Sequence, residues 1–139
     1  MKGTIQEAIK AIHSLLPQAL ATGANNGAGV DCKGYGEALV VVIAGATTSN
    51  GSHAFKVQES SDDAVADAYA DITDATFTAI TTSNDNAVYV GRLNLRGCER
   101  YIRVVDTGTN QTMLGAALIV LAEPQLAPVS QVGTVAFNL

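Results

Sequence analysis

Apolar residues near the start of the chain recur three or four positions apart, which is the spacing of one face of an α-helix. They are Ile5, Ala8, Ile9, Ile12 and Leu16. Thr4 and Glu7 match the T-x-x-E capping box that begins a helix, and Pro17 disfavours helical geometry at the residue before it. We therefore expect an amphipathic helix, followed by a flexible linker. Its apolar stripe must be covered, either by the core of its own domain or by a partner.

From about residue 28 the apolar period changes to two, the period of β-strands. The predicted strands span residues 29–32, 37–45, 53–60, 75–82, 87–95, 100–107 and 113–123, and 133–139 is either a last strand or a tail. The continuous apolar run 37–45 indicates a strand that is buried on both faces. The acidic segment 61–74 is too polar for a core strand, so we expect a long loop there, with at most a helical turn.

About eight short strands separated by turn signals favour an all-β fold, a jelly-roll-like β-sandwich with an N-terminal helix or arm. A Greek-key immunoglobulin-like sandwich is the alternative, although a chain without Trp lacks the Cys–Trp–Cys hallmark of that fold. The 139 residues fit one domain of this kind. We therefore assign residues 1–27 to the helix or arm with its linker, and residues 28–139 to the sandwich.

Composition and charge argue against several classes of function. A formal net charge of -5 does not suit bulk nucleic-acid binding, which requires Lys and Arg to displace phosphate counterions. The sequence contains no run of about 18 apolar residues, so no membrane span is predicted. The charges of Glu7 and Lys10 do not fit a secretory signal, so we expect a cytoplasm-like compartment. Cys32 and Cys98 are either small buried hydrophobes or the two halves of one disulfide.

The sequence contains no pattern that predicts catalysis or a cofactor. His13 and His53 lie in different elements and outside any zinc-binding motif, and neither a phosphate-binding loop nor a serine nucleophile elbow occurs. The acidic segment lacks the Gly and the terminal Glu of a calcium-binding EF-hand loop. We therefore expect no catalytic residue, no metal and no cofactor, and a protein that is not an enzyme.

Charges of opposite sign gather in two separate segments. Six acidic residues fall between residues 59 and 74, and four arginines fall between residues 92 and 103. Each run is either ordinary solvated surface or a docking patch for a partner. On the second interpretation, the candidate partner-binding residues are Arg92, Arg100, Tyr101, Arg103, Glu59, Asp62, Asp63 and Asp67.

The arginine-rich strand has a predicted outward face and a predicted inward face. Alternation places Tyr101, Arg103 and Val105 on one face and Ile102, Val104 and Asp106 on the other. If this strand pairs with the strand before it, Arg92 and Arg103 gather near Tyr101, whose ring can hold a guanidinium. The alternative is an internal role, in which Arg103 pairs with Glu99 or Asp106 and only stiffens the sheet.

Four stretches between Gly34 and Pro128, about two thirds of the chain, carry a resemblance to a known family. They read EALVVVIAGA, KVQESSDDA, VGRLNLRGCERYIRVV and LAEPQLAP, and the most telling motif within them is G-x-x-R-Y-[IV]-R-V, followed by a Gly/Thr turn. The pattern resembles the capsid cement (decoration) proteins of tailed phages, of the type found on the Bordetella phage head.

This resemblance implies a non-enzymatic jelly-roll protein on the outside of an icosahedral capsid of the HK97-like class, where it stabilises contacts between capsomers. The implied partners are the major capsid protein and further copies of the chain, with a dimer favoured over a trimer, and neither nucleic acid nor membrane. The implied location is the virion exterior, after assembly in the host cytoplasm. The alternatives are another phage structural part, such as a head–tail connector or tail protein, and a carbohydrate-binding β-sandwich.

Overall fold

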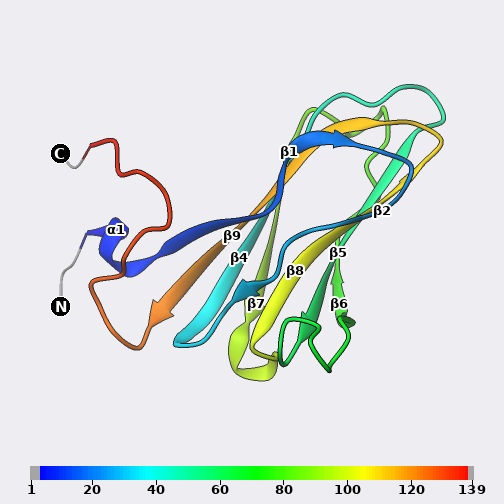
Figure 1. The fold of residues 1–139 in the computed structure, drawn as a ribbon. Coiled ribbons are helices and arrows are strands. Elements are labelled where there is room, and N and C mark those ends of the chain that lie inside the picture. Colours follow the sequence, from blue (N-terminus) through cyan, green and yellow to red (C-terminus); the bar gives the residue numbers. More distant parts are fainter. Residues whose placement is uncertain (1–3, 138–139) are drawn as a thin grey trace.

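Two antiparallel β-sheets pack face to face in the computed structural model, which describes residues 4–137 (Figure 1). Sheet I has the strand order β1 (Lys10–Leu20), β9 (Met113–Pro124), β4 (Tyr35–Ala44) and β7 (Val88–Asn94). Sheet II has the order β2 (Gly23–Asn26), β8 (Tyr101–Thr109), β5 (Ser52–Ser60) and β6 (Ala70–Thr76), with the short β3 (Val30–Asp31) also paired to β8. The helices described are α1 (Ile5–Ala8) and the single 3-10 turn η1 (Leu95–Gly97).

The strand order is that of a jelly roll. With β3 set aside, four strands lie in each sheet, and the chain passes from one sheet to the other at most of its connections. The prediction of an all-β sandwich is therefore confirmed. The core between the sheets is formed by inward side chains of both, among which the largest fully buried ones are Phe55, Leu15, Leu20, Ile80, Ile102, Met113, Ile119 and Leu121.

The predicted N-terminal helix is wrong beyond its first turn. The capping signal itself works, because the Glu7 carboxylate accepts a 2.7 Å hydrogen bond from the Thr4 backbone N–H. After Ala8, however, the chain becomes β1, which pairs with β9 along its length. Residues 10–26, assigned to an arm and linker from the sequence, thus supply one strand to each sheet.

Pro17 marks an edge strand rather than the end of a helix. It lies in β1, whose pairing with β9 shifts register between Leu15 and Gln18. A proline has no backbone N–H, so strands tolerate it at edges and bulges, where no ladder hydrogen bond is lost. Leu15 and Leu20 reach the core from this strand, and their burial stabilises it over the helical alternative.

Strand β4 is buried on one face only, contrary to the prediction for residues 37–45. Ala38, Val40 and Val42 point into the core, whereas Leu39 and Ile43 on the outer face are 40% and 48% exposed. The outer face of sheet I is therefore apolar and uncovered in the single chain.

The acidic segment also departs from the prediction. Residues 61–69 form the expected loop, but β6 begins at Ala70, within the segment predicted as loop, and ends at Thr76. Residues 77–82, predicted as strand, keep only an isolated bridge between Ile80 and His53. Strand β6 is an edge strand with one solvated face, so its sequence lacks an apolar signal.

The C-terminal segment is a tail in the described part of the chain. Residues 125–137 contain no strand and lie beside α1 (Figure 1). The Val129 N–H donates to the Glu7 carbonyl at 3.0 Å, and the Gln131 amide donates to the Gln6 and Ile9 carbonyls, both at 2.7 Å. Residues 138–139 of the predicted last strand lie outside the described residues.

No helix described here is long and apolar enough to span a membrane.

Candidate interaction surface

Strand β8 places most of its side chains as the alternation predicts. Ile102, Val104 and Asp106 are buried between the sheets, while Tyr101 and Arg103 lie on the outer face of sheet II. Val105, predicted on the outward face, is instead buried and only 3% exposed. Arg100 directly precedes the strand and is exposed. The arginine-rich segment thus presents part of its charge on the outer face of sheet II.

Arg103 is held on this face by contacts with two neighbouring side chains. Its Nε and Nη2 donate to the Gln58 Oε1 on the neighbouring strand at 3.0 and 2.7 Å. Its guanidinium lies over the Tyr69 ring, 4.1 Å from the ring centroid. Neither Glu99 nor Asp106, the partners expected for an internal role, forms an ion pair with Arg103 in the described residues.

The contacts of Arg103 continue across the sheet as a network. The Gln58 amide donates to Asp71 at 2.7 Å, and Lys56 donates to the other Asp71 oxygen at 2.8 Å. The hydrogen bond from Lys56, and secondarily that from Gln58, lowers the pKa of Asp71. Burial, and then a hydrogen bond to Asp63, raises the pKa of Tyr69. We call Lys56, Gln58, Tyr69, Asp71 and Arg103 the Arg103 cluster.

The other arginines do not join this cluster. Arg92 lies on β7 in sheet I, where it pairs with Glu37. Arg103 lies on β8 in sheet II, so the two arginines are on opposite sheets. The predicted gathering of Arg92 and Arg103 near Tyr101 is therefore wrong. The ring of Tyr101 instead carries Arg100, 5.0 Å from its centroid, and Arg100 makes two hydrogen bonds to Asp31 at 3.0 and 2.6 Å.

The predicted acidic residues lie together at one end of sheet II, and their oxygens hold the chain in place. The Asp62 carboxylate accepts the backbone N–H groups of Val65, Ala66 and Asp67 at 2.8 to 3.1 Å. Asp67 accepts the Ser61 N–H at 2.8 Å, a bond that lowers the pKa of Asp67. These two carboxylates therefore shape the 61–69 loop.

Glu59 and Asp63 have local partners as well. Glu59 accepts the Glu99 N–H at 2.8 Å, and Asp63 accepts the Tyr69 hydroxyl at 2.6 Å. Since Tyr69 lies under Arg103, the Asp63 contact links the acidic loop to the Arg103 cluster. Sequence reasoning missed Gln58 and Tyr69, because no local pattern indicates that β5 pairs with β8 and brings Gln58 opposite Arg103.

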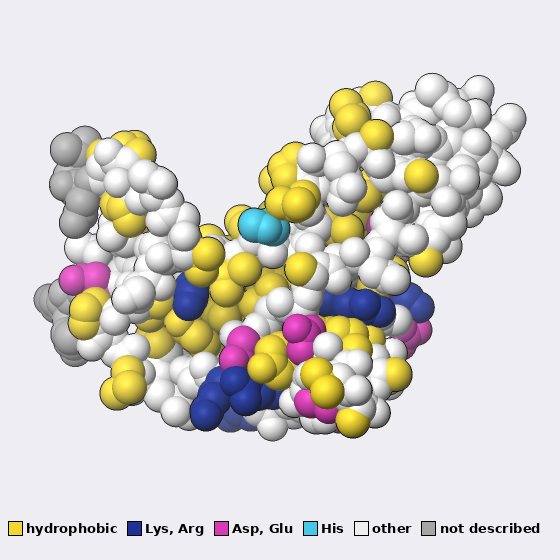
Figure 2. Space-filling view, in the orientation of Figure 1, with side chains coloured by type: hydrophobic (Ala, Val, Ile, Leu, Met, Phe, Trp, Pro, Cys, Tyr) yellow, Lys and Arg dark blue, Asp and Glu magenta, His cyan; other side chains and the backbone are white. Residues whose placement is uncertain are grey.

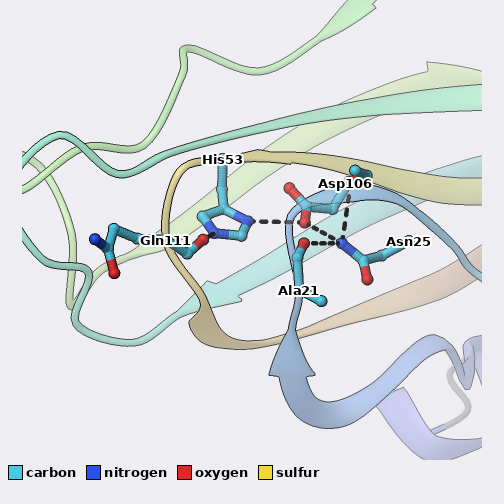
Figure 3. A network of polar contacts seen from close by, with 6 residues as sticks. Ala21, Asn25, His53, Asp106 and Gln111 are labelled. Carbon is cyan, nitrogen blue, oxygen red and sulfur yellow. Dashed lines mark hydrogen bonds and ion pairs between the residues drawn. The ribbon is translucent and has the colours of Figure 1, made fainter.

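A second polar network lies inside the core (Figure 3). His53 Nδ1 is 2.8 Å from Asp106 Oδ2, and both side chains are 0% exposed. His53 Nε2 faces the Gln111 carbonyl at 2.9 Å, and Asn25 donates to both Asp106 Oδ2 and the Ala21 carbonyl. Because a carbonyl only accepts, Nε2 carries a hydrogen, and the second proton is shared between Nδ1 and Oδ2.

This buried pair is net neutral whichever atom holds the shared proton. Burial is the first cause that raises the pKa of Asp106, opposed by its bonds to His53 and Asn25. The second oxygen, Oδ1, is buried and makes no hydrogen bond within the described residues. With no exposed surface, the pair has no route to a substrate, and its chemistry is that of an internal tie between β2, β5 and β8.

Both cysteines are free thiols, so the disulfide alternative for Cys32 and Cys98 is not realised in this structure. Burial raises the pKa of the Cys32 thiol to about 12. Among residues 4–137, no three His, Cys, Asp or Glu side chains gather in a way that would hold a metal ion.

Comparison with known proteins supports the fold. The crystal structure of the SPBc2 prophage-derived protein YomS is similar, with a TM-score of 0.51 over 88% of this chain and 99% of YomS. Sequence identity is 14%, so the likeness concerns the fold alone. No protein-family model and no curated protein sequence matches the chain.

Proposed function

We propose that this chain is a non-enzymatic structural protein of a phage particle, bound to the outside of the capsid through the outer face of sheet II. The motif resemblance to phage cement proteins and the fold shared with a prophage-derived protein support the phage setting. A head–tail connector or tail protein remains the alternative within the same setting.

The observation that carries the proposal is the state of Arg103. Its charge is held in a fixed orientation by Gln58 and Tyr69, and its bonded partner is a neutral amide rather than a carboxylate. A guanidinium has five N–H donors, of which two are used here, so the others are free for a carboxylate of a neighbouring subunit. Preorganisation of this kind reduces the entropy lost on binding.

The acidic loop has a different role in this proposal. The carboxylate oxygens of Asp62 and Asp67 accept hydrogen bonds from the loop backbone, so these residues position the loop. The loop in turn places Asp63 beside the Arg103 cluster. The partner surface we expect therefore offers a carboxylate opposite Arg103 and a basic group opposite the loop. Because many copies bind one particle, modest affinity per contact suffices.

The test is co-sedimentation with empty capsids assembled from the major capsid protein of the phage that encodes the chain. Arg103→Lys keeps the charge but loses the planar fork, and we expect it to melt near the parent temperature while its affinity for capsids falls about tenfold. Arg92→Lys, on the opposite sheet, is the matched control and should load normally. Normal loading of Arg103→Lys, or equal loss with Arg92→Lys, would refute the assignment of this face.

A further inference from the structure

The outer face of sheet I is an apolar surface that the proposed capsid contact does not use. Exposed large hydrophobic side chains on it are Leu39, Ile43, Val88, Val90 and Leu114. The charges of Arg92 and Glu37 at its edge neutralise each other. Figure 2 shows hydrophobic side chains gathered in a hollow between two projecting parts of the molecule. A contiguous apolar surface of this kind marks an interaction site rather than ordinary solvated sheet.

The face ends in a groove where β9 begins. The groove has a volume of about 440 Å³ and is lined by Pro17, Ile43, Ala44, Leu114, Gly115 and Ala116. No charged side chain lines it, and Leu114 at its rim is 66% exposed. A volume in this range accommodates several apolar side chains of a partner.

The chain itself carries an uncharged apolar segment of matching chemistry. Residues 125–137 contain no charged residue, and they pack with α1 into a small terminal lobe, residues 5–9 and 125–137. The lobe leaves Ile5 and Val132 exposed, and Phe137 is 76% exposed. The one acid in the lobe, Glu7, is occupied by its bond to Thr4.

The lobe of the same copy does not reach this groove. Gln131 ties the tail to Ile9, next to Lys10, and Lys10 pairs with Leu121. From Leu121 back to Leu114 the strand spans seven residues, roughly 24 Å. The six residues from Gln131 to Phe137 extend at most roughly 21 Å, and in the structure Phe137 instead lies against α1.

We infer that the groove on sheet I receives the terminal lobe of a second copy of this chain. Each copy has one lobe and one groove at opposite ends of β9, so two copies related by a two-fold axis fill both grooves reciprocally. The exposed apolar residues of lobe and face are then removed from water together, which favours the dimer. This inference concerns sheet I and holds independently of the capsid contact proposed for sheet II.

Disulfide trapping tests the contact directly, in purified protein without capsids. In a Cys98→Ser background, Leu114→Cys and Phe137→Cys variants are oxidised separately and as a mixture. We expect a linked dimer in the mixture and little linkage in either variant alone. Linkage of Leu114→Cys with itself would show that the sheet faces meet each other, and the absence of any linkage would show that the lobe does not dock. Either result would overturn the inference.

Sedimentation velocity supplies the second readout. Leu114→Glu and Phe137→Glu should each raise the dimer dissociation constant at least tenfold, because each places a charge in the apolar contact. Phe137 lies in the tail, far from the core, so its variant separates loss of contact from loss of fold. Val65→Glu, at a position 85% exposed on the acidic loop, is the control and should dimerise as the parent does. A parent that is monomeric at high concentration, or a Leu114→Glu variant that dimerises normally, would refute the contact.

Discussion

Asp106 lies on the core face of β8, in line with Ile102 and Val104. A carboxyl group at such a position must find partners, because an unpaired buried charge is costly. It finds His53 on β5 and Asn25 on β2. A charged residue on the inward side of an otherwise apolar alternation is therefore a signal, visible in sequence, that the core contains a polar tie.

We predict that Asp106→Asn lowers the free energy of unfolding by about 1–3 kcal/mol. The new amide can take two orientations at the position of Oδ2. If its NH₂ lies there, it faces the NH₂ donor of Asn25. If its oxygen lies there, both His53 nitrogens must be protonated, with no carboxylate nearby to balance the charge. Each choice loses a buried hydrogen bond or buries a charge. Urea denaturation measures the change, and Asp71→Asn on the exposed face, expected within about 0.5 kcal/mol of the parent, is the control.

The exposed pair of Asp31 and Arg100 has a predictable pH dependence. The hydrogen bond from Arg100 lowers the pKa of Asp31 from 3.8. The folded state therefore holds this proton less tightly than the unfolded chain, so the stabilisation is present above pH 3.8 and is lost as the pH falls through the folded pKa. We expect Asp31→Asn to be less stable by about 0.2–1 kcal/mol at pH 7 and equal to the parent near pH 2.

Thermal unfolding at both pH values tests this expectation. In an Arg100→Gln background, the effect of Asp31→Asn should become smaller, because the largest cause of the lowered pKa is gone and only the hydrogen bond and charge of Lys33 remain. A difference that persists at pH 2, or one that is unchanged by Arg100→Gln, would assign the effect to another cause.

At the scale of elements, the Asp62 carboxylate accepts the largest number of backbone N–H hydrogen bonds among the side chains that shape the 61–69 loop. Asp62 accepts three consecutive backbone N–H groups, from Val65, Ala66 and Asp67, in a segment without other secondary structure. Hydrogen bonds to an ionised acceptor are stronger than neutral ones, so this single side chain replaces the ladder that a strand would provide.

We predict that Asp62→Ala accelerates amide hydrogen exchange of residues 65–67 about tenfold, while the melting temperature changes little. Loss of these bonds opens the loop locally without exposing the core. Asp63→Ala, which removes only the bond to the Tyr69 hydroxyl, should leave these amides protected. Equal exchange rates in the parent and in Asp62→Ala would mean that the loop holds its shape by other contacts.

The N-terminal segment shows why the spacing of apolar residues alone gives a wrong prediction for an edge strand. Ile5, Ile9, Ile12 and Leu16 fit helical spacing, but in the structure only the first belongs to a helix. Strand β1 has an irregular register near Pro17, which breaks the strict alternation that would reveal a strand. The tertiary gain from pairing with β9 then outweighs the local preference.

At the scale of the whole molecule, the sequence predicts the all-β sandwich and the faces of β8, because both follow from period and turn spacing. It does not predict which strands pair. Arg92 and Arg103 are eleven residues apart, yet β7 and β8 cross from one sheet to the other. The Arg103 cluster depends on Gln58 and Tyr69, which approach only when β5 and β8 pair. Contacts of this kind arise from topology, which local patterns do not encode.

The His53–Asp106 network has a kinetic consequence. Its members at positions 21, 25, 53, 106 and 111 come from strands and turns that are distant along the chain, so it is complete only when β2, β5 and β8 have assembled. Interactions that form after the transition state slow unfolding and leave the folding rate almost unchanged. We therefore expect the destabilisation in Asp106→Asn to appear as faster unfolding in stopped-flow measurements, with refolding within about twofold of the parent. A slower refolding rate would instead place the network in the folding nucleus. On this prediction, the His53–Asp106 pair determines how long a folded molecule lasts before it unfolds.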